Sequence, residues 1–332
     1  MISGERMTQA IGLSLLGSEP PELLRDLALA ADDSGVGTMW IACHLFRRDP
    51  VAMAAAALAA TSRLGIVLMA LSPYVMHPVY ATMAAATLDE YFPGRVRLCF
   101  GVGAPRDLAA AGIAAPQPLA TLAEAIEIAR CLLGGETIAF HGERFQVAGR
   151  SVATGKRPVP VMLAASGPRM LELAGKAADG AVISAAASPQ FVAWSLEQVV
   201  RGEAASGRRA RKIGLVQVAV DEDARRAHGR LRRNLGFILR GGHHARNLAL
   251  AGTQLDQAAL AAAFAREDWT EVDALVTDDV VTRHAASGTI DQASEALARY
   301  RTVGLDEIVL AGVDDPEMLH RLFSANSHQR AK

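Results

Sequence analysis

The sequence predicts an α/β protein, a (β/α)8 TIM barrel with insertions at the C-terminal face, formed by a single domain over residues 1–332. Eight short apolar segments of strand length alternate with helical segments along almost the whole chain. Such alternation implies a parallel sheet, and eight units are the number that closes a parallel sheet into a barrel. The competing architecture, an open doubly wound sheet, is disfavoured because no Gly-x-Gly-x-x-Gly motif follows the first strand.

The first half of the chain supplies four of the predicted strands. They are Ala10–Leu15, Thr38–Cys43, Leu64–Ala70 and Val96–Phe100. The helices between them are predicted at Glu22–Ser34, 50–61 and Val79–Tyr91. Proline stands at the start of each of these helices, where a missing backbone N–H costs nothing and the fixed φ suits the first turn.

The second half of the chain supplies the other four strands, interrupted by two insertion segments at 104–150 and 241–280. The strands are predicted at Val159–Leu163, Gly180–Ile183, Ile213–Val220 and Glu307–Ala311. The helices are predicted at Leu119–Leu133, Arg169–Ala177, from Pro189 onward, 225–233, Ile290–Val303 and Pro316–Phe323. Thr137–Val147 alternates like a hairpin, which we expect to cover a barrel end, whereas 241–279 has helical periods but no strand pattern.

The composition argues against several classes of function. The chain carries 34 Lys and Arg against 35 Asp and Glu, so we expect no binding to nucleic acid or to a membrane. No apolar run is long enough to cross a bilayer, and the first nine residues read as a leader that is not a signal peptide. Three separated cysteines form no Cys-x-x-Cys pair, and His243–His244 lacks the further ligands that a metal site needs. We therefore expect a cytoplasmic protein without a disulfide framework or a metal.

In a barrel of this type, the chemistry lies where strands end and loops begin. The residues at these places are Ser14, His44, 71–77, 101–107, 165–169, Ser184 and 311–312. His44 directly follows the second strand, and an unperturbed imidazole pKa of about 6.5 suits a proton donor or acceptor. A packing histidine is the alternative, and Cys43 should point to the other side of the strand, which argues against a Cys–His nucleophile. Arg106 and Asp107 are expected to form an ion pair near the barrel mouth.

The segment 158–184 has the order strand, tight turn, helix, strand, which is a βαβ unit. Its turn consists of Ala165, Ser166, Gly167, Pro168 and Arg169. These small residues leave room for a ligand near the backbone, and the free N–H groups and positive end of the helix favour a phosphate. An ordinary helix cap with a tight turn is the alternative interpretation.

Four stretches of the sequence contain motifs that resemble those of a known protein family. They are 35–44 (GVGTMWIACH), 72–103 (with SPYVMHP, TLDE and a closing Gly-Val-Gly), 158–180 and 287–310. Together they resemble the bacterial luciferase-like family of flavin- and deazaflavin-dependent oxidoreductases. The resemblance is closest to its coenzyme F-420-dependent, methylenetetrahydromethanopterin reductase-like branch. It implies a flavin or deazaflavin ring in the barrel mouth, its phosphate on the turn 165–169, and a non-proline cis peptide bond within 69–71.

The strand-end positions and the resemblance together assign roles to particular residues of this chain. The catalytic residues are predicted to be His44 and Tyr74, and a tyrosine that packs at the rim is the equal alternative for Tyr74. The cofactor-binding residues are predicted to be Ser72, Gly101, Gly103, Ala165, Ser166, Gly167, Pro168, Arg169 and Ser184. Departures from the family pattern at Ser14, Cys43, Met76 and Arg106 indicate a substrate different from those of the methylene reductases and the sugar-phosphate dehydrogenases.

The predicted function is hydride transfer between coenzyme F-420, a deazaflavin, and a small organic substrate bound at the barrel mouth. The alternative is an FMN-dependent luciferase-like monooxygenase, for which the phosphate turn would serve equally well. A second alternative is a flavin-binding protein without catalysis. The resemblance also implies a homodimer. The alanine-rich faces of Val51–Ala60 and Tyr80–Thr87 could pack against the partner, and packing against the barrel is the equal alternative.

Overall fold

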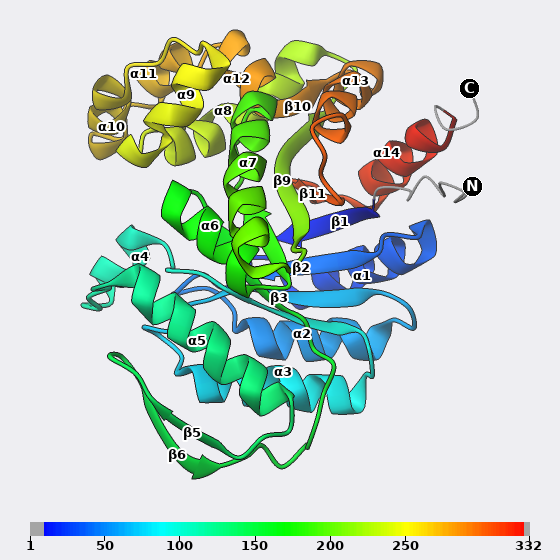
Figure 1. The fold of residues 1–332 in the computed structure, drawn as a ribbon. Helices are drawn as coiled ribbons and strands as arrows, with labels where there is room; N and C mark the ends of the chain where they lie inside the picture. The colour runs from blue at the N-terminus through cyan, green and yellow to red at the C-terminus, as the bar shows by residue number, and fades with distance from the viewer. Residues whose placement is uncertain (1–9, 329–332) are drawn as a thin grey trace, which may run out of the picture.

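The computed structural model of the protein describes residues 10–328, so the predicted leader at residues 1–9 lies outside the described part. Within it, eight parallel strands close into a barrel, as predicted (Figure 1). In barrel order they are β1 (Ala10–Leu15), β2 (Thr38–Ala42), β3 (Gly65–Leu71), β4 (Val96–Phe100), β7 (Val161–Ala165), β8 (Gly180–Ile183), β9 (Arg211–Val220) and β11 (Glu307–Ala311). The pairing of β11 with β1 and of β8 with β9 completes the ring.

Helices form a layer around the barrel (Figure 1). They are α1 (Pro21–Ser34), α2 (Pro50–Ala60), α3 (Pro78–Tyr91), α5 (Pro118–Leu133), α6 (Pro168–Ala177), α7 (Pro189–Ser206), α13 (Ile290–Arg301) and α14 (Pro316–His328). Most of these helices begin with a proline, close to the helix start that the sequence predicted. Asp49 caps α2 by accepting hydrogen bonds from the N–H groups of Val51 and Ala52, at 2.9 and 2.8 Å.

The segment between β9 and β11 builds a second helical layer. It contains α8 (Ala224–Leu239), a short 3-10 turn (Gly242–His244), α9 (Ala245–Ala251), α10 (Gln257–Ala265), α11 (Trp269–Leu275) and α12 (Asp278–His284). These helices share an apolar cluster of their own and stand together beyond one end of the barrel (Figure 1). A ninth strand, β10 (Ala285–Gly288), pairs with the last four residues of β9 and had no counterpart in the sequence prediction.

The hairpin of the first insertion lies in the outer layer. Its strands are β5 (Ile138–His141) and β6 (Gln146–Arg150), and Ile138 packs with Ile128 and Leu132 of α5. The expectation that this hairpin covers a barrel end was therefore wrong. Its apolar side chains find their partner on the outer face of α5, and Glu124 of that helix accepts hydrogen bonds from successive N–H groups of the hairpin turn.

The N-terminal end of the barrel interior is closed by a buried polar network. The carboxylate of Glu307, whose residue is 1% exposed, accepts hydrogen bonds from Trp40 Nε1 at 2.9 Å, from Arg211 Nε at 3.1 Å and from the Thr38 hydroxyl. A Cβ on Gly12 would lie within 2.8 Å of this network, so only glycine fits there. A layer of apolar side chains follows above it: Val67, Cys99, Met162, Val182, Ile213 and Val309.

Two helices of the outer layer cross with their backbones in contact. A Cβ on Gly175 of α6 would overlap the carbonyl of Val199 in α7, and a Cβ on Gly202 of α7 would overlap the carbonyl of Glu172. Glycine on both helices is thus what lets α6 and α7 approach so closely. No helix within residues 10–328 has the length and apolarity needed to cross a membrane.

Candidate active site

Small side chains predominate at the C-terminal end of the barrel interior. Side chains alternate between the two faces of a strand, so the positions two residues beyond the apolar layer also face inward. These positions carry Gly101, Ala164, Ser184 and Ala311, together with the larger Met69 and Leu215, and Ser14 and Ala42 continue the same inward rows on β1 and β2. A Cβ on Gly101 would lie 2.7 Å from Ala70 Cβ and 3.5 Å from Ala164 Cβ, which places this glycine on the inner face. The mouth therefore offers a shelf on which a flat ring can lie close to the backbone.

The end of β3 forms one side of this shelf. The peptide bond between Met69 and Ala70 is cis, as the sequence resemblance implied. The pairing of β3 with β4 changes register here, between Leu68 and Leu71. Ala70 is only half-buried, so this edge of the mouth is accessible.

His44 and Asp107 meet at the rim of the mouth. His44 follows β2, Asp107 lies on α4 (Pro105–Ala110), and His44 Nδ1 is 3.5 Å from Asp107 Oδ2. Their side chains are 36% and 29% exposed, so both remain accessible to a ligand. The expected pair of Arg106 with Asp107 was wrong, because consecutive helical residues point about 100° apart. Arg106 instead lies over the ring of Phe237 in α8, 5.9 Å from its centroid.

The environment of His44 favours its neutral form. Burial is the main cause of a lowered imidazole pKa, and the nearby charge of Arg47 acts in the same direction. Asp107 opposes them, through its charge and its hydrogen bond. At neutral pH, the imidazole can therefore accept a proton, and Asp107 stabilises the imidazolium that results.

Ser72 and Tyr74 brace the mouth from the loop after β3. The Ser72 hydroxyl donates to the carbonyl of Val102 at 2.7 Å and accepts from the Tyr74 N–H at 3.3 Å. The Tyr74 hydroxyl donates to the carbonyl of Pro116 at 2.6 Å and lies 3.1 Å from Thr121 Oγ1. Both hydroxyls are thus engaged with the protein, which favours a role in fixing the rim over direct chemistry.

Gly103 lies beside this loop, at the end of β4. Its φ is +95°, a conformation that residues with a Cβ rarely adopt. A Cβ here would also come within 3.3 Å of Ser72 Cβ. Gly103 thus allows the ends of β3 and β4 to meet closely at the rim.

The predicted phosphate turn is open to solvent. Gly167, Pro168 and Arg169 are exposed, and no side chain caps α6. A Cβ on Gly167 would meet nothing within 4 Å, so a ligand has free approach to the backbone. Ala165 is buried at the end of β7 and Ser166 is half-buried. An uncapped helix start with this access suits an anion.

The loop after β8, which carries Ser184, is held from the second helical layer. Asn247 of α9 donates to the carbonyl of Ala186 at 2.7 Å and accepts from the N–H of Ser188 at 3.0 Å. His284 Nδ1 donates to the same carbonyl at 3.0 Å. Ala186 adopts a φ of +60°, which alanine rarely does. This clamp fixes one wall of the mouth, and neither Asn247 nor His284 lay in a sequence motif.

The structure thus brings most of the predicted residues to one end of the barrel. His44, Gly101, Gly103, Ser184 and the turn 165–169 all follow strand ends at the C-terminal face. Asp107 is the partner of His44 that the sequence analysis missed, although it lay within the strand-end range 101–107. Within the described residues, no group of three or more His, Cys, Asp or Glu side chains is arranged to hold a metal.

Comparisons with known proteins give a consistent result. The model of a family described as luciferase-like monooxygenase matches residues 4–307. The chain is 27% identical over 305 residues to the 5,10-methylenetetrahydromethanopterin reductase of Methanolobus tindarius, covering 90% of this chain and 92% of that protein.

Two solved structures share the fold. The coenzyme F-420-dependent tetrahydromethanopterin reductase from Methanopyrus kandleri has a TM-score of 0.86 and 21% identity, covering 95% of this chain and 96% of that one. The oxygenating constituent of 3,6-diketocamphane monooxygenase from Pseudomonas putida, in complex with FMN, has a TM-score of 0.71 and 17% identity, covering 96% and 95%.

These findings confirm the resemblance inferred from the sequence motifs, together with the barrel fold and the expectation of an enzyme. The family match extends over most of the chain and includes every predicted site residue. The protein therefore belongs to the luciferase-like monooxygenase family.

Proposed function

We propose that the protein is an oxidoreductase that transfers a hydride between coenzyme F-420 and a small organic substrate in the barrel mouth. The observation that carries this proposal is the His44–Asp107 pair at the rim of a shelf of small side chains. The solved Methanopyrus kandleri reductase, which is named as dependent on this coenzyme, matches over almost the whole chain, and a dehydrogenase named as F420-dependent matches over 87% of it, which supports the choice of cofactor.

The residues of the mouth fit such a cofactor. The shelf formed by Ala70, Gly101 and Ala164 accepts a planar ring, and Ser184 and Gly103 border it. The turn 165–169 receives the phosphate at the uncapped start of α6. The bound deazaflavin supplies the hydride chemistry, and the protein supplies position and proton transfer.

His44 is the group that we assign to proton transfer. Hydride transfer at a carbon bound to oxygen or nitrogen leaves a proton to be removed or supplied at that heteroatom. His44 Nε2, the ring nitrogen that does not face Asp107, exchanges this proton. Asp107 orients the ring through Nδ1 and stabilises its charged form.

The runner-up is an FMN-dependent monooxygenase. The specific observation in its favour is the FMN complex of the diketocamphane monooxygenase constituent, which shares the fold over almost the whole chain. FMN also ends in a phosphate, so the turn 165–169 suits either cofactor. The second alternative is a flavin-binding protein without turnover.

Cofactor titration followed by a substrate screen distinguishes these functions. We would titrate the purified protein with coenzyme F-420 and with FMN, each oxidised and reduced, and follow fluorescence. Selective binding of F-420, with substrate-dependent change of its absorbance, is the expected result. Selective binding of reduced FMN with oxygen consumption would overturn it in favour of the monooxygenase. Tight binding without turnover on a broad panel of alcohols, aldehydes and imines would favour the binding protein.

We also propose that the protein forms a homodimer through α2 and α3. Tyr80, Met83 and Tyr91 of α3 are 60%, 47% and 74% exposed, an unusual amount of large apolar surface on one helix. The neighbouring surface of α2 consists of alanines, which allow close approach. Light scattering should give the mass of a dimer, and Tyr80→Asp should give a monomer.

A further inference from the structure

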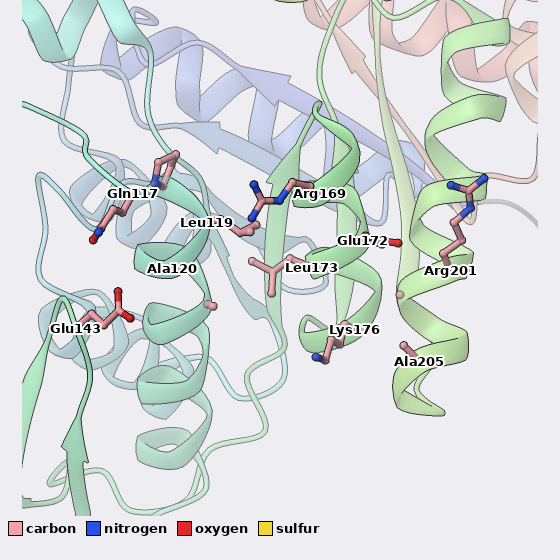
Figure 2. Close-up of a pocket in the computed structure, with 13 residues that line it drawn as sticks. Gln117, Leu119, Ala120, Glu143, Arg169, Glu172, Leu173, Lys176, Arg201 and Ala205 are labelled. Carbon is pink, nitrogen blue, oxygen red and sulfur yellow. The ribbon is translucent and has the colours of Figure 1, made fainter.

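A hollow of about 840 Å³ lies on the outer wall of the barrel, on the side of the phosphate turn (Figure 2). It is formed by α5, α6, α7 and the turn of the β5–β6 hairpin. Its lining residues are Gln117, Pro118, Leu119, Ala120, Ala123, Glu143, Arg169, Glu172, Leu173, Lys176, Arg201, Gly202 and Ala205. Arg169 is the second residue of α6, so the hollow begins at the turn to which we assign the cofactor phosphate.

Three cations line this hollow without a carboxylate partner. Among the described residues, Arg169 and Lys176 form no ion pair, and Arg201 donates to Gln198 Oε1 at 3.0 Å. Other arginines nearby are paired: Arg130 and Arg208 both bind Asp179, at 2.9 and 2.7 Å. The cations of the hollow therefore remain available to an anionic ligand.

The side of α6 that faces α5 has a definite pattern. Arg169, Leu173 and Lys176 are spaced by four and three residues, so they share one face of the helix. In Figure 2, Leu173 and Lys176 point toward α5, whereas Glu172 points toward α7. Arg169 and Lys176 are roughly 10 Å apart along the helix axis, at 1.5 Å of rise per residue. The face thus carries a cation at each end and an apolar side chain between them.

The wall of the hollow that lies opposite α6 is mainly apolar. Leu119, Ala120 and Ala123 of α5 are apolar, and Gln117 at its start offers an amide. The close crossing of α6 with α7 at Gly175 and Gly202 holds the third cation, Arg201, against the same hollow. The two acidic residues leave a net charge of +1 on the lining, concentrated along α6 and α7.

We propose that this hollow binds the chain of carboxylates that continues beyond the phosphate of coenzyme F-420. This inference rests on the proposed function. The side chain of F-420 extends past its phosphate as linked glutamyl units, whereas FMN ends at the phosphate. Carboxylates at intervals along an aliphatic chain match cations at intervals along an apolar wall. The hollow would therefore distinguish the two cofactors by their tails, at a distance from the ring.

A double charge reversal, Lys176→Glu with Arg201→Glu, tests the proposal without touching the phosphate turn. The ligands are F-420 and a deazaflavin mononucleotide that ends at the phosphate, and fluorescence gives each dissociation constant at low and high salt. We expect F-420 to bind about tenfold or more weakly, with a shallower salt dependence, and the mononucleotide to bind as before. Arg25→Glu with Arg150→Glu is the control, since it changes the net charge equally on surfaces away from the hollow.

The outcomes separate this inference from the proposed function. Equal weakening of both ligands, or equal weakening by the control, would show a general charge effect and overturn the tail site. Unchanged F-420 binding in the double variant would also overturn it and leave the proposed function standing. Failure of the unaltered protein to bind either deazaflavin would overturn both. If the double reversal unfolds, Lys176→Ala with Arg201→Ala is compared in the same way.

Discussion

At the N-terminal end of the barrel, Glu307 is 1% exposed and accepts hydrogen bonds from three side chains. At the C-terminal end, the His44 side chain is 36% exposed and has one ionic partner at 3.5 Å. The same strands lead to both ends, but strand side chains form the N-terminal (lower) end, whereas His44 and Asp107 of the C-terminal (upper) end lie beyond the strands. Buried polar groups that bond mainly to one another close the lower end, where Arg97 Nη1 has no hydrogen-bond partner among the described residues. Accessible groups with spare hydrogen-bonding capacity mark the upper end as the place for a ligand.

Glycine serves the two ends in different ways. At the lower end, Gly12 makes room for the side chains of the buried network, which a Cβ would contact at 2.7–2.8 Å. At the upper end, Gly101 leaves the floor of the mouth without a side chain. A Cβ there would meet the methyl groups of Ala70 and Ala164. The lower glycine thus serves packing within the protein, and the upper one serves the ligand.

The largest effect on stability is expected from Glu307→Ala. It leaves Trp40, Thr38 and Arg211 without their buried acceptor, and Arg97, whose pKa burial lowers, without a compensating charge. Removing one partner of a buried ionic network typically costs about 3–5 kcal/mol. Urea denaturation should show this loss in the free energy of unfolding. Glu307→Gln, which keeps an acceptor, should lose less, and equal losses would contradict the account.

His44→Asn should have the opposite effect to Glu307→Ala, because it should reduce catalysis and leave stability nearly unchanged. We expect kcat/KM to fall by about a hundredfold to ten-thousandfold, the usual contribution of a general acid or base. The free energy of unfolding and the dissociation constant of F-420 should change little, because His44 is half-exposed and has few partners. Steady-state kinetics and a cofactor titration on the same preparation check this. A large stability loss with retained turnover would reverse the assignment of the two ends.

Asn247→Ala tests a region that combines both characters, since it is buried like the lower end but supports the mouth. It removes two hydrogen bonds to the loop after β8 and should lower the free energy of unfolding by about 1–3 kcal/mol. F-420 affinity should fall with it, because the loop carries Ser184.

Ala186→Gly should lower the free energy of unfolding less than Ala187→Gly does, because of these two residues only Ala186 has a positive φ. Equal effects of the two glycines would count against a strained clamp.

Acid should weaken the second helical layer, which holds the loop after β8. Burial is the main cause that lowers the pKa of His244 and of His284 to about 4. Between about pH 6.5, the unfolded value, and about pH 4, the unfolded chain therefore binds protons that the folded chain does not. Stability should fall as the pH drops through this window. Denaturation at about pH 7 and about pH 5 checks it, and His284→Gln should reduce the difference between them.

The sequence predicted the barrel and its mouth because both are encoded locally. Apolar strands of regular spacing, prolines at helix starts and the turn 165–169 are all visible in short stretches. β10 was missed because its four residues, Ala-Ala-Ser-Gly, lack the large or β-branched side chains that signal a strand. The clamp was missed because Asn247 and Ala186 lie 61 residues apart and meet only through tertiary packing.

The pairing of His44 with Asp107 could be predicted only in part from the sequence. Both residues stood at predicted strand ends, and helix geometry alone argues against an ion pair between the consecutive Arg106 and Asp107. What the sequence lacked was the path of the chain after β4, which turns α4 toward β2. Local geometry could thus exclude the wrong partner but could not supply the right one.

The finest test of the upper end uses two variants with opposite expected signs. In the direction where neutral His44 accepts a proton, kcat/KM should rise with pH through the His44 pKa, which lies below its ordinary value. Asp107→Asn removes a charge that raises this pKa, so the acidic limb should move to lower pH. Arg47→Gln removes a charge that lowers the pKa, so the limb should move to higher pH. Shifts in the same direction would show that the limb reports another group, and His44 would lose its assigned role.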